Sequence, residues 1–78
     1  MARQLRIGRA PDCDIVIDDR RVSRYHAVLT TDTSGAYIEH VGGQTGTTVN
    51  GVPVRGRMLL QRGDALGFGS ITLDTELL

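Results

Sequence analysis

The chain has 78 residues, a length that suits one small domain. Nine arginines balance nine acidic residues, so the formal net charge is zero, which argues against a nucleic-acid partner because polyanion binders usually carry an excess of cations. No apolar run is long enough to span a membrane, and the first residues lack the hydrophobic segment of a signal peptide, so we expect no membrane partner. The single cysteine, Cys13, cannot form an internal disulfide, and we therefore expect a cytoplasmic protein.

Short runs of alternating or β-branched residues predict four strands in the first half of the chain, at residues 4–7, 15–17, 26–31 and 36–41. A turn is expected between the first two strands, because Pro11 fixes φ and the neighbouring aspartates can bond nearby amides. Gly35 can adopt a positive φ and is expected to close a hairpin between the third and fourth strands.

The second half of the chain begins with a glycine-rich loop, residues 42–46, and continues with predicted strands at residues 47–49, 52–54, 58–60, 65–68 and 71–73. The dipeptide Asn50-Gly51 is a strong signal for a type I′ hairpin turn. Pro53 cannot donate a ladder hydrogen bond, so the strand after that turn is expected at a sheet edge. Many short strands with turns every few residues predict an all-β sandwich of short antiparallel strands.

Three loops that are rich in hydrogen-bond donors alternate with these strands. The first contains Gly8 and Arg9, the second contains Ser23, Arg24 and His26, and the third covers residues 46–51. We expect the loops to form a binding rim at one end of the sheet. Guanidinium, hydroxyl and backbone N–H donors suit a phosphate group, which carries about −1.5 to −2 charges and three strong acceptor oxygens.

The same loops resemble the signature blocks of the forkhead-associated (FHA) domain family. The matching blocks are Ile7-Gly8-Arg9, Ser23-Arg24-Tyr25-His26 and Gly46-Thr47-Thr48-Val49-Asn50-Gly51. The resemblance runs from about Leu5 to Leu73, so residues 1–78 are expected to form a single FHA-like domain. It implies an FHA/SMAD-like β-sandwich that binds phosphothreonine proteins or peptides in kinase-dependent signalling. It also implies that the domain is not an enzyme and needs no cofactor or metal.

The resemblance assigns expected roles to individual residues. Arg9, Ser23 and Arg24 would donate to the phosphate or to the peptide backbone beside it, and Gln44 and Thr45 would add peptide contacts. Arg21, two residues before the family serine, would select a peptide residue C-terminal to the phosphothreonine. Structural support of the loops would come from Gly8, His26, Gly46, Thr47, Asn50 and Gly51, with His26 bracing the loops without touching the ligand.

The chain departs from the family pattern in the third block. The family loop usually reads Ser-Thr-Asn-Gly-Thr, whereas residues 43–47 read Gly-Gln-Thr-Gly-Thr, so the asparagine that holds the peptide main chain is replaced by Thr45. Threonine has one short donor, and losing such a bond costs about 1 kcal/mol, or severalfold in affinity. Gln44 is the expected substitute for the lost amide.

A second departure lies at the N-terminus. Family members carry a strand or two ahead of the Gly-Arg block, whereas only a few residues precede Gly8 here. Either the chain is a trimmed piece, or the sandwich lacks its N-terminal edge strand. An open edge would allow strand addition by a partner or by a second copy. The alternative function is therefore a degenerate FHA scaffold that mediates phosphate-independent assembly, including a homodimer through that edge.

Other patterns carry less weight. Ser23 with His26 suggests nucleophilic catalysis, but no third orienting group and no nucleophile elbow are identifiable. Cys13, His26 and His40 fit no usual zinc-ligand spacing. Residues 42–48 are glycine-rich like a P-loop, but they lack its lysine and no helix is predicted to follow.

Two further polar residues have plain interpretations. His40 stands at a strand end where the family often has aspartate, and we expect it to form a hydrogen bond within the turn. Arg20 lies beside Asp18 and Asp19, and we interpret it as part of a solvated turn whose charges neutralise one another.

Overall fold

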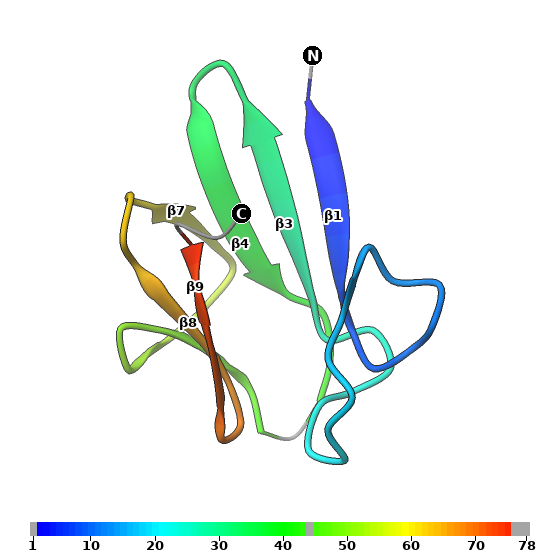
Figure 1. The fold of residues 1–78 in the computed structure, drawn as a ribbon. Coiled ribbons are helices and arrows are strands. Elements are labelled where there is room, and N and C mark those ends of the chain that lie inside the picture. The colour runs from blue at the N-terminus through cyan, green and yellow to red at the C-terminus, as the bar shows by residue number, and fades with distance from the viewer. Residues whose placement is uncertain (1, 44, 76–78) are drawn as a thin grey trace.

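The computed structural model describes residues 2–43 and 45–75, and these residues form two β-sheets and no α-helix (Figure 1). In chain order the strands are β1 (Arg3–Gly8), β2 (Ile15–Val16), β3 (Ala27–Asp32), β4 (Gly35–His40), β5 (Thr47–Val49), β6 (Val52–Pro53), β7 (Arg57–Leu60), β8 (Ala65–Phe68) and β9 (Ile71–Asp74). One sheet has the order β2-β1-β3-β4-β7 and the other β6-β5-β8-β9. The predicted all-β sandwich of mostly antiparallel strands is therefore confirmed.

In the larger sheet, side chains alternate between the two faces along each strand. β3 pairs antiparallel with β1 and β4, and the register places Leu29 opposite both Leu5 and Ile38. Because side chains on a strand point alternately to the two faces, this register gathers the apolar residues on one face. β2 is parallel to β1 and pairs with it only through Ile15 and Val16.

The smaller sheet depends on one tight turn. Asn50 and Gly51 have φ values of 52° and 82°, which confirms the predicted type I′ turn between β5 and β6. Pro53 lies on β6, at the edge of this sheet, as its missing N–H predicts. β6 ends at Pro53, one residue earlier than expected, although the Val54 backbone N–H still donates to the Thr47 carbonyl at 2.8 Å, the next partner in register.

The core lies between the two sheets. Its largest fully buried side chains come from both sheets and from the loop before β3, and they are Phe68, Ile7, Ile38, Leu66, His26 and Val22. The histidine in this list is a polar ring inside an apolar core, and such a group is costly to bury unless its nitrogen atoms are hydrogen-bonded. The loop that carries it is therefore anchored in the interior.

Several connections meet at one end of the sandwich. The β2–β3 connection, the described part of the β4–β5 connection and the β8–β9 turn lie at the lower end of Figure 1, whereas the β3–β4 turn lies at the upper end. β4 ends at His40, one residue earlier than the predicted strand. The Val41 N–H still donates to the His26 carbonyl at 2.8 Å, the next partner in register, but the Gly42 N–H donates to the same carbonyl at 3.3 Å, so the regular ladder stops there. This pairing ties the β4–β5 connection to the β2–β3 connection.

The strand pairing shows which sheet edges are open, and the sequence had suggested an open edge where an N-terminal strand is absent. Among the described residues, β9 pairs only with β8, and residues 3–6 of β1 pair only with β3. One amide of this stretch is covered by a side chain, since the backbone N–H of Arg6 donates to Asp14 at 2.8 Å. The outer side of β9 is thus the longest edge of the smaller sheet.

Candidate phosphate-binding site

A pocket of about 250 Å³ opens where the loops meet. Its lining comes from the β1–β2, β2–β3 and β4–β5 connections, and consists of Arg9, Arg20, Arg21, Val22, Ser23, Gly43 and Thr45. We call it the Arg9–Ser23 pocket. It brings together four residues that the sequence predicted for peptide binding, Arg9, Arg21, Ser23 and Thr45. Gln44, which was also expected to contact the peptide, falls outside the described residues.

Ser23 is held in place by the ring of His26. The Ser23 backbone N–H donates to His26 Nδ1 at 3.0 Å, so the ring carries its hydrogen on Nε2, which lies 2.7 Å from the Gly46 carbonyl and donates to it. The ring is fully buried and meets Phe68 edge-on, with centroids 5.3 Å apart. His26 therefore lies behind the pocket and joins two of the loops that form it.

Arg9 is oriented by the backbone opposite it. Its backbone N–H donates to the Ser23 carbonyl at 2.9 Å, and its Nε–H donates to the Val22 carbonyl at 3.1 Å. Among the described residues, its terminal guanidinium nitrogens have no hydrogen-bond partner, so they can bind a ligand. Gly8 is needed for this close approach, because a Cβ at that position would overlap the Arg24 carbonyl.

Thr45 contributes to the wall of the pocket in an unexpected way. Its hydroxyl donates to the Arg21 carbonyl at 2.9 Å, so the hydrogen of that hydroxyl is already used within the protein. The oxygen can still accept a bond from a ligand. In this structure the threonine joins the β2–β3 and β4–β5 connections, whereas the sequence had suggested a donor to the peptide.

Arg24 points to a neighbouring pocket instead. That pocket, of about 390 Å³, is lined by Arg9, Ala10, Pro11, Asp12, Arg24 and Tyr25, so Arg9 borders both. Tyr25 donates its phenol hydrogen to the Asp12 carboxylate at 2.9 Å, and this bond raises the pKa of Tyr25 above its usual value. Two predicted phosphate donors, Ser23 and Arg24, therefore line different pockets, and the third, Arg9, borders both.

The remaining support residues lie at the two ends of β5. At the start of β5, the Thr47 hydroxyl lies 2.9 Å from His40 Nδ1, and the His40 ring meets the His26 ring edge-on. At its other end, Asn50 donates to the Asp64 carboxylate and accepts from the Ala65 N–H, each at 2.9 Å. Asn50 thus braces the β7–β8 turn, and neither Asn50 nor Gly51 lines the pocket.

Sequence reasoning missed two of these features. It placed Arg20 in a solvated, self-neutralised turn, but the structure puts Arg20 on the pocket lining. It expected His40 to bond within its turn, but the ring reaches the first residue of β5. Neither contact has a local sequence signal, because both depend on how separate loops are placed by the fold.

The electrostatic character of the Arg9–Ser23 pocket is cationic. Among the described residues that line it, three of seven are arginines and none is acidic. Within residues 2–43 and 45–75 the ion pair that forms joins Arg6 to Asp12 at 4.0 Å, and no lining arginine has a carboxylate at that distance. Three unneutralised guanidinium groups around one small pocket favour an anionic ligand.

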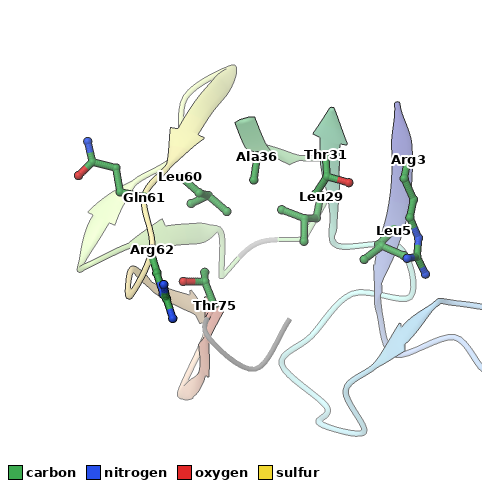
Figure 2. Close-up of a pocket in the computed structure, with 9 residues that line it drawn as sticks. All are labelled: Arg3, Leu5, Leu29, Thr31, Ala36, Leu60, Gln61, Arg62 and Thr75. Carbon is green, nitrogen blue, oxygen red and sulfur yellow. The ribbon is translucent and has the colours of Figure 1, made fainter. Parts of the chain in front are cut away.

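A third cavity, shown in Figure 2, has a different character. It has a volume of about 310 Å³ and a mainly apolar lining, with Leu29 and Leu60 pointing into it from opposite sides (Figure 2). None of the predicted site residues lines it. This cavity therefore lies apart from the candidate site.

Residues 5–69 match the sequence model of the FHA domain family. The chain belongs to the FHA domain family. It is 44% identical over 69 residues to an ABC transporter ATP-binding/permease protein of Mycobacterium tuberculosis, a match that covers 88% of this chain and 8% of that protein. It is 39% identical over 66 residues to the oxoglutarate dehydrogenase inhibitor of Corynebacterium efficiens, covering 85% of this chain and 46% of that one. This FHA chain thus spans less than half the length of either relative.

Solved FHA structures superpose closely on this domain. Mycobacterium tuberculosis EmbR in complex with a low affinity phosphopeptide gives a TM-score of 0.86 at 31% identity, covering 91% of this chain and 19% of EmbR. An FHA domain determined to analyse phosphothreonine-dependent FHA domain interactions gives 0.84 at 31% identity, covering 91% of this chain and 73% of that one. These similarities agree with the predicted family and fold.

Neither a membrane-spanning helix nor a metal cluster is found in residues 2–43 and 45–75. No helix there is long and apolar enough to cross a membrane. No group of three or more His, Cys, Asp or Glu side chains in residues 2–43 and 45–75 is arranged to hold a metal ion.

Proposed function

We propose that this FHA domain is a phosphothreonine-dependent interaction module, which docks a segment of a partner protein after a Ser/Thr kinase has acted. The observation that carries the proposal is the Arg9–Ser23 pocket, where free guanidinium nitrogens and a serine hydroxyl stand beside each other with no carboxylate among the described lining residues. The solved relatives that bind phosphopeptides or take part in phosphothreonine-dependent interactions support it.

The roles follow from the contacts. The Arg9 terminal nitrogens and the Ser23 hydroxyl donate to phosphate oxygens, and Arg24 reaches the phosphate from the neighbouring pocket that shares Arg9. Thr45 and Gln44 contact the peptide main chain, and Arg21 selects a residue C-terminal to the phosphothreonine. His26 acts indirectly, by fixing the position of Ser23 against the Gly46 loop.

The double variant Arg9→Ala with Ser23→Ala tests this assignment by calorimetric titration of a phosphothreonine peptide. Each charge-assisted bond contributes about 1.5–3 kcal/mol, so we expect the double variant to lose more than about a hundredfold in affinity. Both side chains are at least partly exposed, so the fold should be retained and is checked by circular dichroism. Arg55→Ala, an exposed arginine outside both pockets, is the control and should bind normally. Unchanged affinity in the double variant would remove the proposal.

A degenerate scaffold is the second candidate, and two observations favour it. The donor of Thr45 is already used by Arg21, and the outer side of β9 has no paired strand among the described residues. Such a scaffold would assemble without phosphate, for example as a homodimer joined edge to edge. Light scattering during size exclusion at high protein concentration tests it, since a monomer at all concentrations would exclude the homodimer.

The proposed module acts by binding and not by catalysis. We propose a protein or peptide partner, rather than nucleic acid or membrane lipid, because the charge of the whole chain is balanced and three of its nine arginines line one small pocket. We also propose a cytoplasmic site of action, in keeping with the unbridged thiol of Cys13.

A further inference from the structure

The cavity of Figure 2 lies at the end of the sandwich that carries the β3–β4 turn, away from the Arg9–Ser23 pocket (Figures 1 and 2). Its floor is the inner face of the larger sheet. One cross-strand row of this floor runs over β1, β3, β4 and β7 through Arg3, Thr31, Ala36 and Leu60. The next row adds Leu5 and Leu29, which are paired across β1 and β3.

The smaller sheet leaves this floor without a covering strand. Among the described residues, none of β5, β6, β8 or β9 lines the cavity, and the opposite wall comes from Thr75, which follows β9, and from residues 61–62 of the β7–β8 turn. Leu5 and Ala36 are accordingly only partly buried, whereas Ile7 and Ile38, deeper on the same strands, are fully buried. The apolar inner face of the larger sheet is thus left partly uncovered at this end.

Thr75 places a polar atom on the wall of the cavity. Its backbone N–H donates to the Asp64 carbonyl at 3.2 Å, which holds the residue in place. Its hydroxyl oxygen is buried and has no hydrogen-bond partner among the described residues. Buried hydroxyl groups in folded proteins are nearly always hydrogen-bonded, so this oxygen is available to a group that enters the cavity.

The open edge of β9 borders the same cavity. β9 pairs only with β8 among the described residues, and an unpaired edge can accept a further strand through its backbone groups. Leu73 faces the core from β9, and Thr75, two residues later, lines the cavity. Side chains alternate between the faces of a strand, so a strand laid along this edge would direct every second side chain toward the uncovered floor.

Two arginines stand on opposite sides of the cavity, Arg3 at the start of β1 and Arg62 in the β7–β8 turn (Figure 2). Both are exposed, and neither has a carboxylate within 4.0 Å among the described residues. They can therefore pair with an acidic side chain of an occupant. An apolar cavity of about 150 Å³ holds one benzene-sized group, so a volume of about 310 Å³ has room for about two apolar side chains.

We propose that the outer edge of β9 and this cavity, together called the β9 groove, bind an extended segment of a partner protein as an added strand. The segment has apolar residues at alternate positions, two of which enter the cavity, and a carboxylate beside them that pairs with Arg3 or Arg62. A second copy is the less suitable occupant, because the Leu73 that its β9 edge would bring packs against its own core. The groove lies apart from the Arg9–Ser23 pocket, so this binding needs no phosphothreonine.

The probes are unphosphorylated peptides, Thr-X-Thr-X-Thr-Asp and Asp-Thr-X-Thr-X-Thr, in which X is Val, Ile, Leu or Phe. Each is titrated by calorimetry into the wild-type domain, beside a peptide of the same composition whose X residues are adjacent. We expect at least one alternating peptide to bind about tenfold more tightly than its adjacent counterpart, because only alternation puts both apolar side chains on the cavity face. The bound peptide should also slow hydrogen exchange of the amides in residues 71–74.

Two variants test the cavity and its charges separately. Ala36→Leu fills part of the cavity from β4 and should weaken binding by about tenfold, with folding checked by urea denaturation. The double variant Arg3→Glu with Arg62→Glu should lose about fivefold for the Asp peptide and regain it when Lys replaces that Asp. This exchange decides the case even if Ala36→Leu does not fold. Arg55→Glu, at an exposed arginine outside the cavity, is the matched control and should bind as the wild type does.

Binding that requires alternation, and that follows the exchanged charges, would support the β9 groove. Binding by none of the peptides, or equal effects of the double variant and Arg55→Glu, would overturn it. A concentration-dependent dimer in light scattering that the peptides dissociate would make a second copy the occupant. Peptide binding only by a chain that ends at Thr75 would make residues 76–78 the occupant, and either result would refute a partner segment. The phosphothreonine titration is separate and decides none of these outcomes.

Discussion

The backbone N–H of Ser23 donates to Nδ1 of His26 at 3.0 Å, and this bond decides which ring nitrogen carries the hydrogen. Because Nδ1 accepts, Nε2 is the protonated atom, and it donates to the Gly46 carbonyl 2.7 Å away. One buried ring therefore fixes the Ser23 segment relative to the Gly46 loop. These two segments form two sides of the Arg9–Ser23 pocket.

Replacing this ring with a hydrocarbon of similar size should weaken both the fold and the pocket. His26→Phe keeps an aromatic group beside Phe68 but leaves the Ser23 N–H and the Gly46 carbonyl without partners. Each unsatisfied group costs about 1–3 kcal/mol, so the free energy of unfolding in urea should fall by about 2–5 kcal/mol. Tyr37→Phe, which removes only an exposed hydroxyl contact with Ser34, should cost under about 1 kcal/mol. Equal stability of His26→Phe and wild type would contradict the proposed role.

The close approach of β1 to the Ser23 segment should not tolerate a side chain at residue 8. In Gly8→Ala the new methyl group would overlap the Arg24 carbonyl, a backbone atom that cannot rotate away. We expect a loss of more than about 2 kcal/mol in the free energy of unfolding, as for other overpacked sites. Gly42→Ala is the matched control, because its methyl group would meet the Tyr25 carbonyl at an ordinary 3.6 Å. Similar denaturation midpoints for the two variants would refute this prediction.

Restoring an amide at residue 45 should strengthen peptide binding. In Thr45→Asn the longer side chain has two donor hydrogens and an acceptor, so it can keep the bond to the Arg21 carbonyl and still reach the peptide main chain. One added hydrogen bond is worth about 1 kcal/mol, which predicts about a fivefold gain in affinity for a phosphothreonine peptide by calorimetry. Thr33→Asn, in the exposed β3–β4 turn, should have no effect. A loss of affinity in Thr45→Asn would show that the threonine is the better fit.

The stability of the β7–β8 turn should depend on pH in the acid range. Asp64 accepts from the Gln61 N–H at 2.8 Å and from the Asn50 amide at 2.9 Å, and these bonds hold its pKa below the usual value. A lowered folded-state pKa means that the stabilisation is complete above the unfolded-state pKa, about 3.9, and is lost as the pH falls through the lower folded-state pKa. Asp32 accepts a hydrogen bond from the Ser34 hydroxyl, which likewise lowers its pKa. Protonation of Asp32 should therefore add to the loss of stability at low pH.

Urea denaturation between pH 7 and pH 2 checks this dependence. The wild type should lose stability only toward the acid end, and Asp64→Asn should be less stable at pH 7 and lose less on acidification. Asp18→Asn serves as the control, because the Asp18 carboxylate makes no hydrogen bond or ion pair with the described residues. An Asp64→Asn profile that runs parallel to the wild-type profile would contradict the assigned role.

The strands could be predicted because their signals are local. Alternation in residues 4–7 and the Asn50-Gly51 dipeptide act over a few residues, so they are visible in the sequence and survive folding. Strand ends were less certain, and Val41 shows why. Its N–H bonds to the His26 carbonyl as a continuing strand would, but the Gly42 N–H bonds to the same carbonyl, so the regular ladder ends before Val41.

The site could be predicted only in part, because it is made of separate loops. Arg9 and Ser23 were found through the family resemblance, and the fold places both on one pocket. The sequence did not predict the bond from Thr45 to Arg21, the placement of Arg24 in the neighbouring pocket or the position of Arg20 on the pocket lining. Each depends on the relative position of two loops, which no short stretch of sequence encodes.

The most direct test of phosphothreonine recognition is a calorimetric titration of the wild-type domain with a degenerate phosphothreonine peptide library, beside the same library carrying threonine or phosphoserine. The pocket predicts binding of the phosphothreonine library alone, with affinity that weakens as salt screens the charges. Binding that is equal for phosphorylated and unphosphorylated peptides, or no binding to any of them, would contradict it. The open β9 edge would then become the first place to look for a partner.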